Sequence, residues 1–298
     1  MIALFSHYPA ERTAAWADAL RAAIGAPVAL AGEAAPETVE IAVVTRPLPG
    51  ALAGLPKLRL IQSLWAGVEG LLADPTLPAG VPIARLVDPG LATAMAEAVA
   101  AHVLALHRQL PRYRAQQAAG LWRQHPQPLA RDCPVAILGL GAMGKAAAAM
   151  LEGIGFPVLG WHRADGAAGL DRLLAEARIV VNLLPLTAET RHLMDAGFFA
   201  RLRPGAAVIN FGRGGHLVVP DLIAALDSGR VGHAVLDVFE SEPLAPDSAL
   251  WRHPGVTLTP HVAAETGLLS AAACVAANIA AFRAGRPLTG LVDRTRGY

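Results

Sequence analysis

The chain is poor in cysteine, in aromatic residues and in charge. Only two of its 298 residues are cysteines, Cys133 and Cys274, and their separation matches no metal-ligand spacing. A disulfide between them stays open, but two free thiols in a reducing compartment are the simpler interpretation. Aromatic residues make up 5% of the chain and charged residues 16%. This composition is typical of a compact globular protein with an aliphatic core and does not suit a disordered chain.

The chain also lacks an excess of either charge and lacks a signal peptide. Lys and Arg number 25 and Asp and Glu number 24, so no strong field favours nucleic acid or a membrane surface. Residues 1–7 have neither the charged start nor the long apolar run of a secretory signal. The most apolar stretch, residues 91–106, contains Glu97 and His102 and reads as a buried helix, not a membrane span. We therefore expect a cytoplasmic protein with no nucleic-acid or membrane partner.

Apolar runs of strand length alternate with helical patterns along the whole chain. This alternation predicts an α/β fold with two doubly wound parallel-sheet domains, a flavodoxin-like one and a Rossmann one, with a cleft between them. We expect residues 1–98 plus 265–298 to form a substrate domain and residues 99–264 to form a dinucleotide-binding domain. The expected strands are 2–5, 28–30, 41–45, 58–64 and 81–87, then 135–138, 158–161, 179–184, 207–211, 234–238 and 256–259, and the expected long helices are 10–24, 91–110 and 266–283.

A glycine-rich loop begins the second series of strands. Gly139, Gly141 and Gly144 follow a strand pattern directly and open a strong helix pattern. The first glycine permits a tight turn, the second lets the backbone approach a pyrophosphate, and the third allows the helix to pack on the sheet. The N–H groups of Ala142 and Met143 at the helix start would face the anion. The loop therefore predicts a dinucleotide site, although such a pattern alone is weak.

The next strand ends in His162 and Arg163, about twenty residues past the loop, where NAD enzymes usually carry an acidic residue for the ribose hydroxyl. A guanidinium can pair with a 2′-phosphate, which a carboxylate would repel. NADPH is therefore the expected cofactor, with NADH as an option. A solvated surface arginine is the alternative interpretation.

Polar residues follow three later strands at the point where each strand ends. Arg213 lies in a glycine turn, Asp237 ends the next strand, and His261 follows the last strand and a proline. Carboxyl ends of strands line the ligand crevice of a doubly wound sheet, so these side chains should converge there. Asp237 could meet a nicotinamide carboxamide. Glu240 and Glu242 are competing catalytic carboxylates, and the pattern alone does not choose between them.

The chain resembles the D-2-hydroxyacid dehydrogenase family almost from end to end, and most closely its short glyoxylate/hydroxypyruvate reductase A branch. The motifs that carry the resemblance are Ser63–Glu69 (SLWAGVE), Met95–Val99 (MAEAV), Gly139–Gly144 (GLGAMG), Asn182–Thr187 (NLLPLT), Arg213-Gly214, Asp237–Leu244 (DVFESEPL), Thr259–Ala263 (TPHVA) and Val292–Tyr298 (VDRTRGY). The resemblance favours Glu242 over Glu240 and implies that Leu184 and Pro185 also contact the cofactor. Phe211 and Gly212 depart from the small or aliphatic residues common before the arginine.

The resemblance implies a role for each site residue in reducing a short 2-keto acid such as glyoxylate or hydroxypyruvate. Backbone N–H groups of Ala66, Gly67 and Val68 would bind the substrate carboxylate, and Trp65 would limit the pocket to short acids. Arg213 would polarise the keto oxygen and orient the acid. His261 would donate the proton, and Glu242 would orient its ring and favour the imidazolium. No metal is needed, because two cationic groups already face the developing oxyanion.

Three points stay open at this stage. Core packing for Trp65 and an interdomain salt bridge for Arg213 are structural alternatives to these roles. The segment 108–123 mixes arginines with Tyr113 and Trp122, and the resemblance implies a homodimer built through it, with a solvated surface as the alternative. Rival functions are an NAD-dependent dehydrogenase of a bulkier D-2-hydroxy acid and a dinucleotide-sensing binding protein of the same fold.

Overall fold

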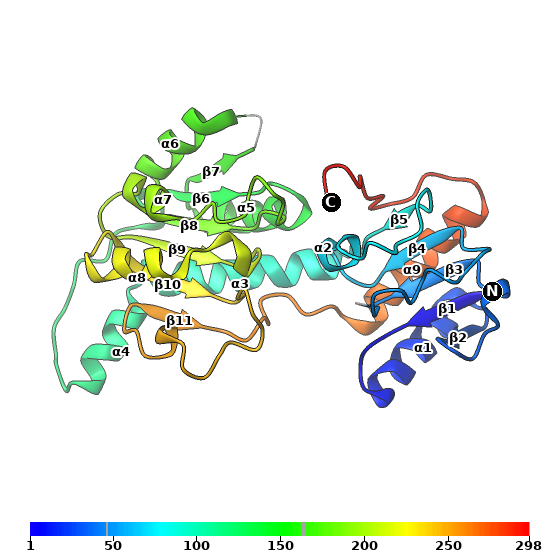
Figure 1. The fold of residues 1–298 in the computed structure, drawn as a ribbon. Helices are drawn as coiled ribbons and strands as arrows, with labels where there is room; N and C mark the ends of the chain where they lie inside the picture. The colour runs from blue at the N-terminus through cyan, green and yellow to red at the C-terminus, as the bar shows by residue number, and fades with distance from the viewer. Residues whose placement is uncertain (46, 163–164, 298) are drawn as a thin grey trace. The chain divides into compact units, whose positions relative to one another are not determined.

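The computed structural model describes residues 1–45, 47–162 and 165–297, and the chain divides into two compact units (Figure 1). One unit comprises Met1–Leu91 with Thr266–Tyr298, and the other comprises Ala92–Glu265. Each unit contains one sheet whose strands are all parallel, with α-helices between most consecutive strands. This architecture confirms the predicted fold class of two doubly wound α/β domains.

The first unit contains a five-stranded sheet in the order β2-β1-β3-β4-β5, which is the flavodoxin-like order. Its strands are β1 (Ile2–Phe5), β2 (Val28–Leu30), β3 (Ile41–Val44), β4 (Leu60–Ser63) and β5 (Ile83–Ala84). The sequence predicted a longer last strand, but only Ile83 and Ala84 of that run pair with β4, and Ala84 also forms an isolated bridge to Leu291. The short helix α2 (Glu69–Leu72) follows β4.

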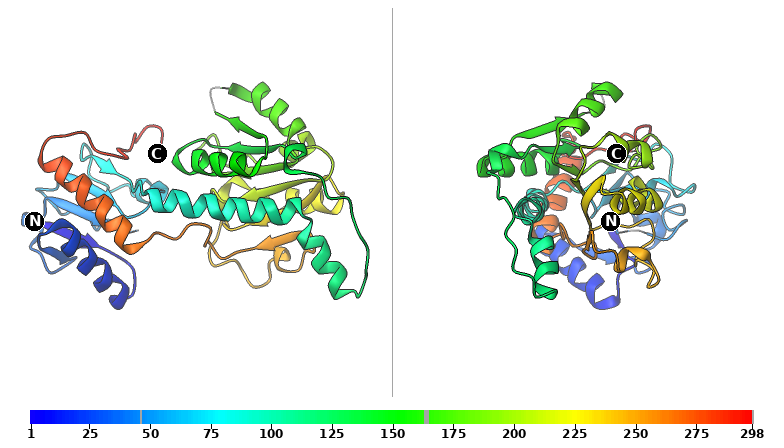
Figure 2. Two further views of the ribbon diagram at one scale, coloured as in Figure 1. Left: turned by 180° about the vertical axis from the view of Figure 1, so that it is seen from behind. Right: turned by 90° about the vertical axis from the view of Figure 1, so that its left-hand side faces the viewer.

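Alternating side chains of the first sheet face two apolar layers. Ile2 and Leu4 pack with α1 (Ala10–Ile24) and α9 (Leu268–Arg283), while Ala3 and Phe5 face the opposite cluster. The two helices lie side by side on one face of the sheet (Figure 2). Burial on both faces explains why these strands read as continuous apolar runs.

The second unit contains a six-stranded sheet in the order β11-β10-β9-β8-β6-β7. Helices α3 and α5 share one apolar cluster, and α6, α7 and α8 share the cluster on the other face. Strand β7 lies on one side of β6 and strand β8 on the other, so the strand order reverses at β6. Ligands bind at such a switch point. The elements are α3 (Pro89–His107), α4 (Leu110–Ala118), β6 (Val135–Leu138), α5 (Ala142–Ile154), β7 (Val158–Trp161), α6 (Gly166–Glu176), β8 (Ile179–Asn182), α7 (Ala196–Arg201), β9 (Ala206–Asn210), α8 (Val219–Asp227), β10 (Val231–Leu236) and β11 (Val256–Leu258), with 3-10 turns at Ala130–Asp132, Gly214–His216 and Ala249–Trp251. In the first unit, one 3-10 turn, Pro36–Thr38, precedes β3.

The predicted helix over residues 91–110 is two helices in the structure. Helix α3 ends at His107, Gln109 adopts a left-handed φ of 58°, and α4 then begins with Pro111 in its first turn. Proline lacks the N–H that would have continued the earlier helix, so it is tolerated only where a helix starts. By length and composition α3 alone, among the described helices, could cross a membrane, but its buried side packs in the same cluster as the β6 side chains. It is therefore a core helix of this unit.

Candidate active site

Three neighbouring strands carry the polar residues that the sequence singles out. Arg213 follows β9, Glu242 lies in the loop after β10, and His261 follows β11. These strands are adjacent and parallel, so their carboxyl ends meet at one edge of the second sheet. The strand-end prediction thus corresponds to a real neighbourhood within a single unit.

The imidazole of His261 contacts the carboxylate of Glu242. Their Nδ1 and Oε2 atoms are 2.7 Å apart, and the second carboxylate oxygen accepts the N–H of Phe239 at 3.0 Å. Glu240 points elsewhere and pairs with Arg191 at 3.2 Å. The histidine ring is 40% exposed and the Glu242 side chain 29%, so a ligand can reach the pair. The geometry therefore selects Glu242 as the histidine's partner, a choice that residue spacing left open.

Asp237 holds the backbone that carries His261. His261 adopts a left-handed φ of 56°, which is rare outside glycine and costs about 1 kcal/mol or more. Its N–H donates to the carbonyl of Asp237 at 2.8 Å. The Asp237 carboxylate, 1% exposed, accepts from Thr259 Oγ1 at 2.7 Å and from the N–H groups of Val262 and Ala263 at 2.8 and 3.0 Å. The predicted contact of Asp237 with the nicotinamide carboxamide stays a prediction.

The turn of Arg213 packs directly on the loop that carries Glu242. A Cβ atom on Gly214 would lie 1.8 Å from the carbonyl carbon of Phe239, so only glycine fits there. The Arg213 guanidinium donates from Nη1 to the carbonyl of Gly212 at 2.7 Å. Phe211, the unusual residue before this turn, is buried and meets the ring of His102 edge-on, with ring centroids 5.4 Å apart. The aromatic side chain therefore joins the core beneath the turn.

Three buried polar side chains lie under the same turn. Asn182 belongs to the NLLPLT motif of the family resemblance, whereas the sequence did not single out Asn210 and His216. Asn182 and Asn210 end β8 and β9, are paired in the sheet register, and are fully buried together with His216. Asn182 Nδ2 donates to Asn210 Oδ1 and to His216 Nδ1, each at 2.9 Å. The sequence does contain a signal for this group of side chains. An asparagine ends each of two adjacent strands, and a histidine follows the arginine by three residues.

The glycine loop has the geometry that a dinucleotide requires. Gly139 has a φ of 98°, and a Cβ there would lie 2.9 Å from the carbonyl oxygen of Leu183. A Cβ on Gly144 would lie 2.0 Å from the carbonyl oxygen of Gly139, so helix and turn are in close contact. Gly141, at the start of α5, has open space where its side chain would be. The open approach and the helix N-terminus fit a pyrophosphate. Ala142 and Met143 form the first residues of that helix.

The end of β7 combines one predicted residue with one that was missed. His162 is exposed, and its N–H donates to the Asp165 carboxylate at 2.7 Å. Arg163, the predicted partner of a 2′-phosphate, lies outside the described residues. Asp165 comes three residues after His162, and its own N–H donates to the carbonyl of His162 at 2.9 Å.

In the first unit, the segment from Trp65 to Val68 connects β4 to α2. The Trp65 ring lies against Tyr8, with centroids 6.2 Å apart, and Arg12 covers the Tyr8 ring at 4.1 Å. Val68 is buried, whereas Ala66 and Gly67 are half-buried. Within the described residues, no backbone carbonyl accepts from the N–H groups of Ala66, Gly67 or Val68.

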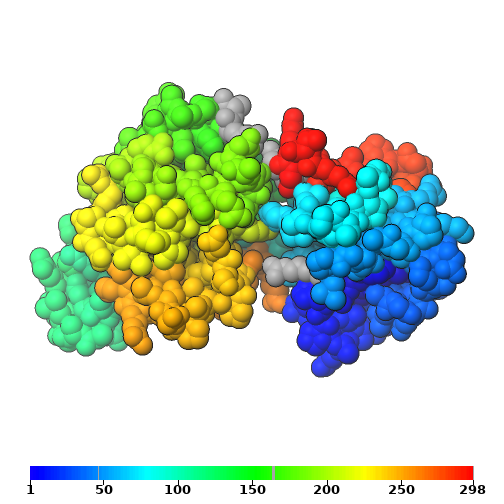
Figure 3. All heavy atoms as spheres, viewed as in Figure 1, coloured from blue at the N-terminus to red at the C-terminus, as the bar shows by residue number. Residues whose placement is uncertain are grey.

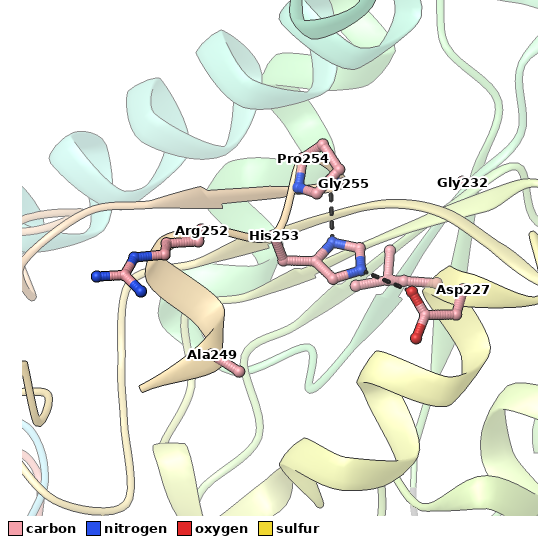
Figure 4. Close-up of a pocket in the computed structure, with 8 residues that line it drawn as sticks. Asp227, Gly232, Ala249, Arg252, His253, Pro254 and Gly255 are labelled. Atoms are coloured by element: carbon pink, nitrogen blue, oxygen red, sulfur yellow. Dashed lines mark hydrogen bonds and ion pairs between the residues drawn. The ribbon is translucent and has the colours of Figure 1, made fainter. Parts of the chain in front are cut away.

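A depression at the opposite edge of the second sheet is unrelated to these residues (Figure 4). It lies at the amino ends of β10 and β11, and His253 there contacts Asp227 at 3.2 Å. Burial, with a smaller effect from the His253 charge, lowers the pKa of the neighbouring His233 to about 4. Over residues 1–45, 47–162 and 165–297, no group of three His, Cys, Asp or Glu side chains could hold a metal ion.

Comparisons with known proteins identify the family of this chain. Residues 100–263 match the family model of the D-isomer specific 2-hydroxyacid dehydrogenase NAD-binding domain. The chain belongs to the D-isomer-specific 2-hydroxyacid dehydrogenase family. It is 40% identical over 274 residues to a glyoxylate/hydroxypyruvate reductase A from Serratia proteamaculans, covering 87% of this chain and 88% of the relative.

Two solved structures of family members are similar over their whole length. A D-isomer specific 2-hydroxyacid dehydrogenase from Xanthobacter autotrophicus, in complex with NADPH and MES, has a TM-score of 0.95 and 40% identity, with 100% of both chains covered. An NADPH-dependent glyoxylate/hydroxypyruvate reductase from Sinorhizobium meliloti, in complex with NADP and sulfate, has a TM-score of 0.92 and 37% identity, covering 100% of this chain and 99% of that one. The family resemblance and the branch suggested by the sequence are thereby confirmed.

Proposed function

We propose that this protein reduces short 2-keto acids, glyoxylate or hydroxypyruvate, to the 2-hydroxy acids, with NADPH preferred and NADH possible. The observation that carries the proposal is the 2.7 Å contact between His261 and Glu242, on the same sheet edge as the turn of Arg213. The identity to reductases of this specificity supports the substrate class. The NADPH and NADP complexes of similar structures support the cofactor.

The side chains at this edge divide the work of reduction. Arg213 binds the acid and polarises its keto oxygen, because a guanidinium can donate two parallel hydrogen bonds. His261 donates a proton from Nε2 to the oxygen as negative charge develops there, since its Nδ1 faces Glu242. Glu242 contacts the Nδ1 atom and so fixes the orientation of the ring. Reduction thus consumes a proton that His261 regains from solvent, to which its ring is exposed.

The cofactor would be held by the glycine loop and by the strand ends beside it. When bound, the reduced nicotinamide supplies the hydride that the keto carbon accepts. Gly139, Gly141 and Gly144, with the N–H groups of Ala142 and Met143, would hold the pyrophosphate. The remaining cofactor contacts in the proposal are His162, Arg163, Leu184, Pro185 and Asp237.

In the first unit, the N–H groups of Ala66, Gly67 and Val68 would bind the substrate carboxylate. Trp65, held against Tyr8, would form an apolar wall that favours short acids.

The test is a cofactor-oxidation assay with a panel of 2-keto acids that increase in size from glyoxylate to phenylpyruvate. We expect turnover of glyoxylate and hydroxypyruvate with NADPH, weaker turnover with NADH, and a steep loss of kcat/KM with side-chain size. His261→Gln should abolish turnover while leaving NADPH binding nearly intact. The proposal would be wrong if no 2-keto acid in the panel oxidised either cofactor.

We further propose that the protein is a cytoplasmic homodimer. Helix α4 and the segment after it protrude from the second unit, as Figure 3 shows. In the segment after the helix, the side chains of Leu121 and Trp122 are 53% and 93% exposed. Large apolar side chains exposed together favour an interface between copies. Two cysteines that are both free thiols support a reducing compartment. A single monomeric species in sedimentation at micromolar concentration would contradict the dimer.

A further inference from the structure

His216 lies between the turn of Arg213 and the loop at Pro185, both within the second unit. Its ring is fully buried, in the turn directly after Arg213. Nδ1 accepts the backbone N–H of Arg213 at 3.2 Å and an amide hydrogen of Asn182 at 2.9 Å. On its other side, Nε2 lies 3.2 Å from the carbonyl oxygen of Pro185. One ring therefore touches both the arginine turn and the loop expected to contact the cofactor.

These contacts determine where the ring carries its proton. Two N–H donors face Nδ1, so that atom must present its lone pair. A carbonyl oxygen faces Nε2, so that atom must carry the hydrogen. The ring is therefore neutral with its proton on Nε2, and either the other tautomer or the imidazolium would set N–H groups against each other in a fully buried site.

The asparagines complete the frame around the arginine turn. Asn210 donates from Nδ2 to the carbonyl of Arg213 at 3.0 Å and accepts the N–H of Gly212 at 3.2 Å. Asn182 accepts the N–H of Leu184 at 3.2 Å. The backbone is thus fixed on both sides of Arg213, and the Leu184–Pro185 segment is tied to the same hydrogen-bonded group.

We propose that His216 is a positioning residue. Its neutral, Nε2-protonated ring fixes the position of the Arg213 turn relative to the Leu184–Pro185 loop. The inference rests on the proposed function for the roles of these two segments. A displaced arginine would weaken recognition of the keto acid, whereas a displaced loop would weaken cofactor binding. The two nitrogens of His216 should therefore affect two different measured constants.

Two substitutions separate the nitrogens, because asparagine reaches the Nδ1 position and glutamine the Nε2 position. His216→Gln keeps the contact with Pro185 but removes the acceptor for Arg213. It should raise KM for glyoxylate and lower kcat, for a combined loss of roughly tenfold or more, with the Kd of NADPH within about threefold of wild type. His216→Asn should instead raise the Kd of NADPH by roughly tenfold and change KM for glyoxylate less.

His107→Gln is the matched control, because His107 is also a buried histidine of this unit and packs against Phe156 with ring centroids 5.1 Å apart. It should lower Tm without changing either constant. Equal effects of the two His216 variants on KM and Kd, or a loss of Tm alone as in the control, would overturn the proposal. A wild-type protein that binds NADPH but reduces no keto acid would contradict the proposed function, and the Kd arm would still decide the role of Nε2.

The tautomer offers a second test that needs no variant. Nitrogen NMR of the wild-type protein, with His216 assigned, should show a hydrogen-bearing Nε2 and a bare Nδ1. An Nδ1-protonated or doubly protonated His216 at neutral pH would refute the proposal even if both variants failed to fold.

Discussion

Replacement of Asp237 by asparagine tests how the histidine loop is held. The substitution keeps the shape of the side chain but replaces one carboxylate oxygen by an NH2 group. Each oxygen of Asp237 faces N–H or O–H donors, from Thr259 and Val262 on one side and Ala263 on the other. Whichever way the amide turns, at least one charge-assisted hydrogen bond becomes a donor–donor contact. Such a bond contributes about 1.5–3 kcal/mol.

The lost energy should appear in the conformation of His261. Its left-handed backbone costs about 1 kcal/mol or more and is stabilised by these contacts. A loss of about 2 kcal/mol changes the equilibrium between the held loop and its alternatives by roughly 30-fold. We therefore expect kcat for glyoxylate in Asp237→Asn to fall by up to roughly 30-fold, within the range that loop displacement alone can produce.

The measurement is steady-state turnover of glyoxylate at saturating NADPH, together with the Kd of NADPH and Tm. Asp227→Asn is the control. In the described chain the Asp227 carboxylate contacts only His253, and the Asp227 side chain is 69% exposed. It should leave kcat unchanged. A kcat in Asp237→Asn within about threefold of wild type would refute the loop-holding role, since that spread is below the energy of one hydrogen bond. An unchanged kcat with weaker NADPH binding would favour the cofactor contact instead.

Three further outcomes are expected. Gly214→Ala should lower kcat/KM for glyoxylate by more than roughly tenfold, because its Cβ would lie 1.8 Å from the carbonyl carbon of Phe239. Gly153→Ala is the control and should leave kcat/KM unchanged, because the space around its Cβ is open. Equal activity of the two variants would contradict this reasoning. Asp165→Asn should raise the NADPH-to-NADH ratio of kcat/KM a few-fold, about the effect of one charge near a phosphate, and an unchanged ratio would place its carboxylate outside the cofactor's field. His233 has a pKa lowered from 6.5 to about 4, so the unfolded chain binds a proton that the folded chain cannot as pH falls through this window. The free energy of unfolding should therefore fall on acidification, by less than about 2 kcal/mol at pH 5 because the ring is partly exposed. Denaturant titrations at several pH values should show that the free energy of unfolding of His233→Gln depends less on pH than that of the wild type. The same pH dependence in the variant and the wild type would assign the loss to other groups.

The central strands of the second sheet could be predicted because β6, β8 and β9 are buried on both faces. Val135 and Ile137 face one helix layer and Ala136 and Leu138 the other, so the whole run is apolar and visible in the sequence. The helix over residues 91–110 was wrong at its end, since apolar periodicity continues across Gln109 while the backbone turns left-handed there. A run of apolar residues indicates burial, and it does not indicate where the backbone leaves the helical conformation.

The site was predictable only as far as strand ends are predictable. Arg213, Glu242 and His261 follow three strands that turn out to be neighbours, and parallel pairing then brings their positions to one edge. Spacing could not choose between Glu240 and Glu242, which are two residues apart in a loop. The choice depends on Arg191, almost fifty residues earlier, which pairs with Glu240 and leaves Glu242 to the histidine.

His216 and Asp237 show why the supporting residues are harder to predict than the reacting ones. A group that meets a ligand must lie at an accessible strand end, and strand ends follow from the hydrophobic pattern. A group that holds another residue in place is buried, and its importance depends on the number of donors and acceptors that the fold brings to it. Asp237 accepts from the side chain of Thr259 and from the amides of Val262 and Ala263, all more than twenty residues away along the chain. Substitution of such a residue removes a set of contacts at once, so its effect on turnover should exceed that of any single exposed hydrogen bond at the same edge.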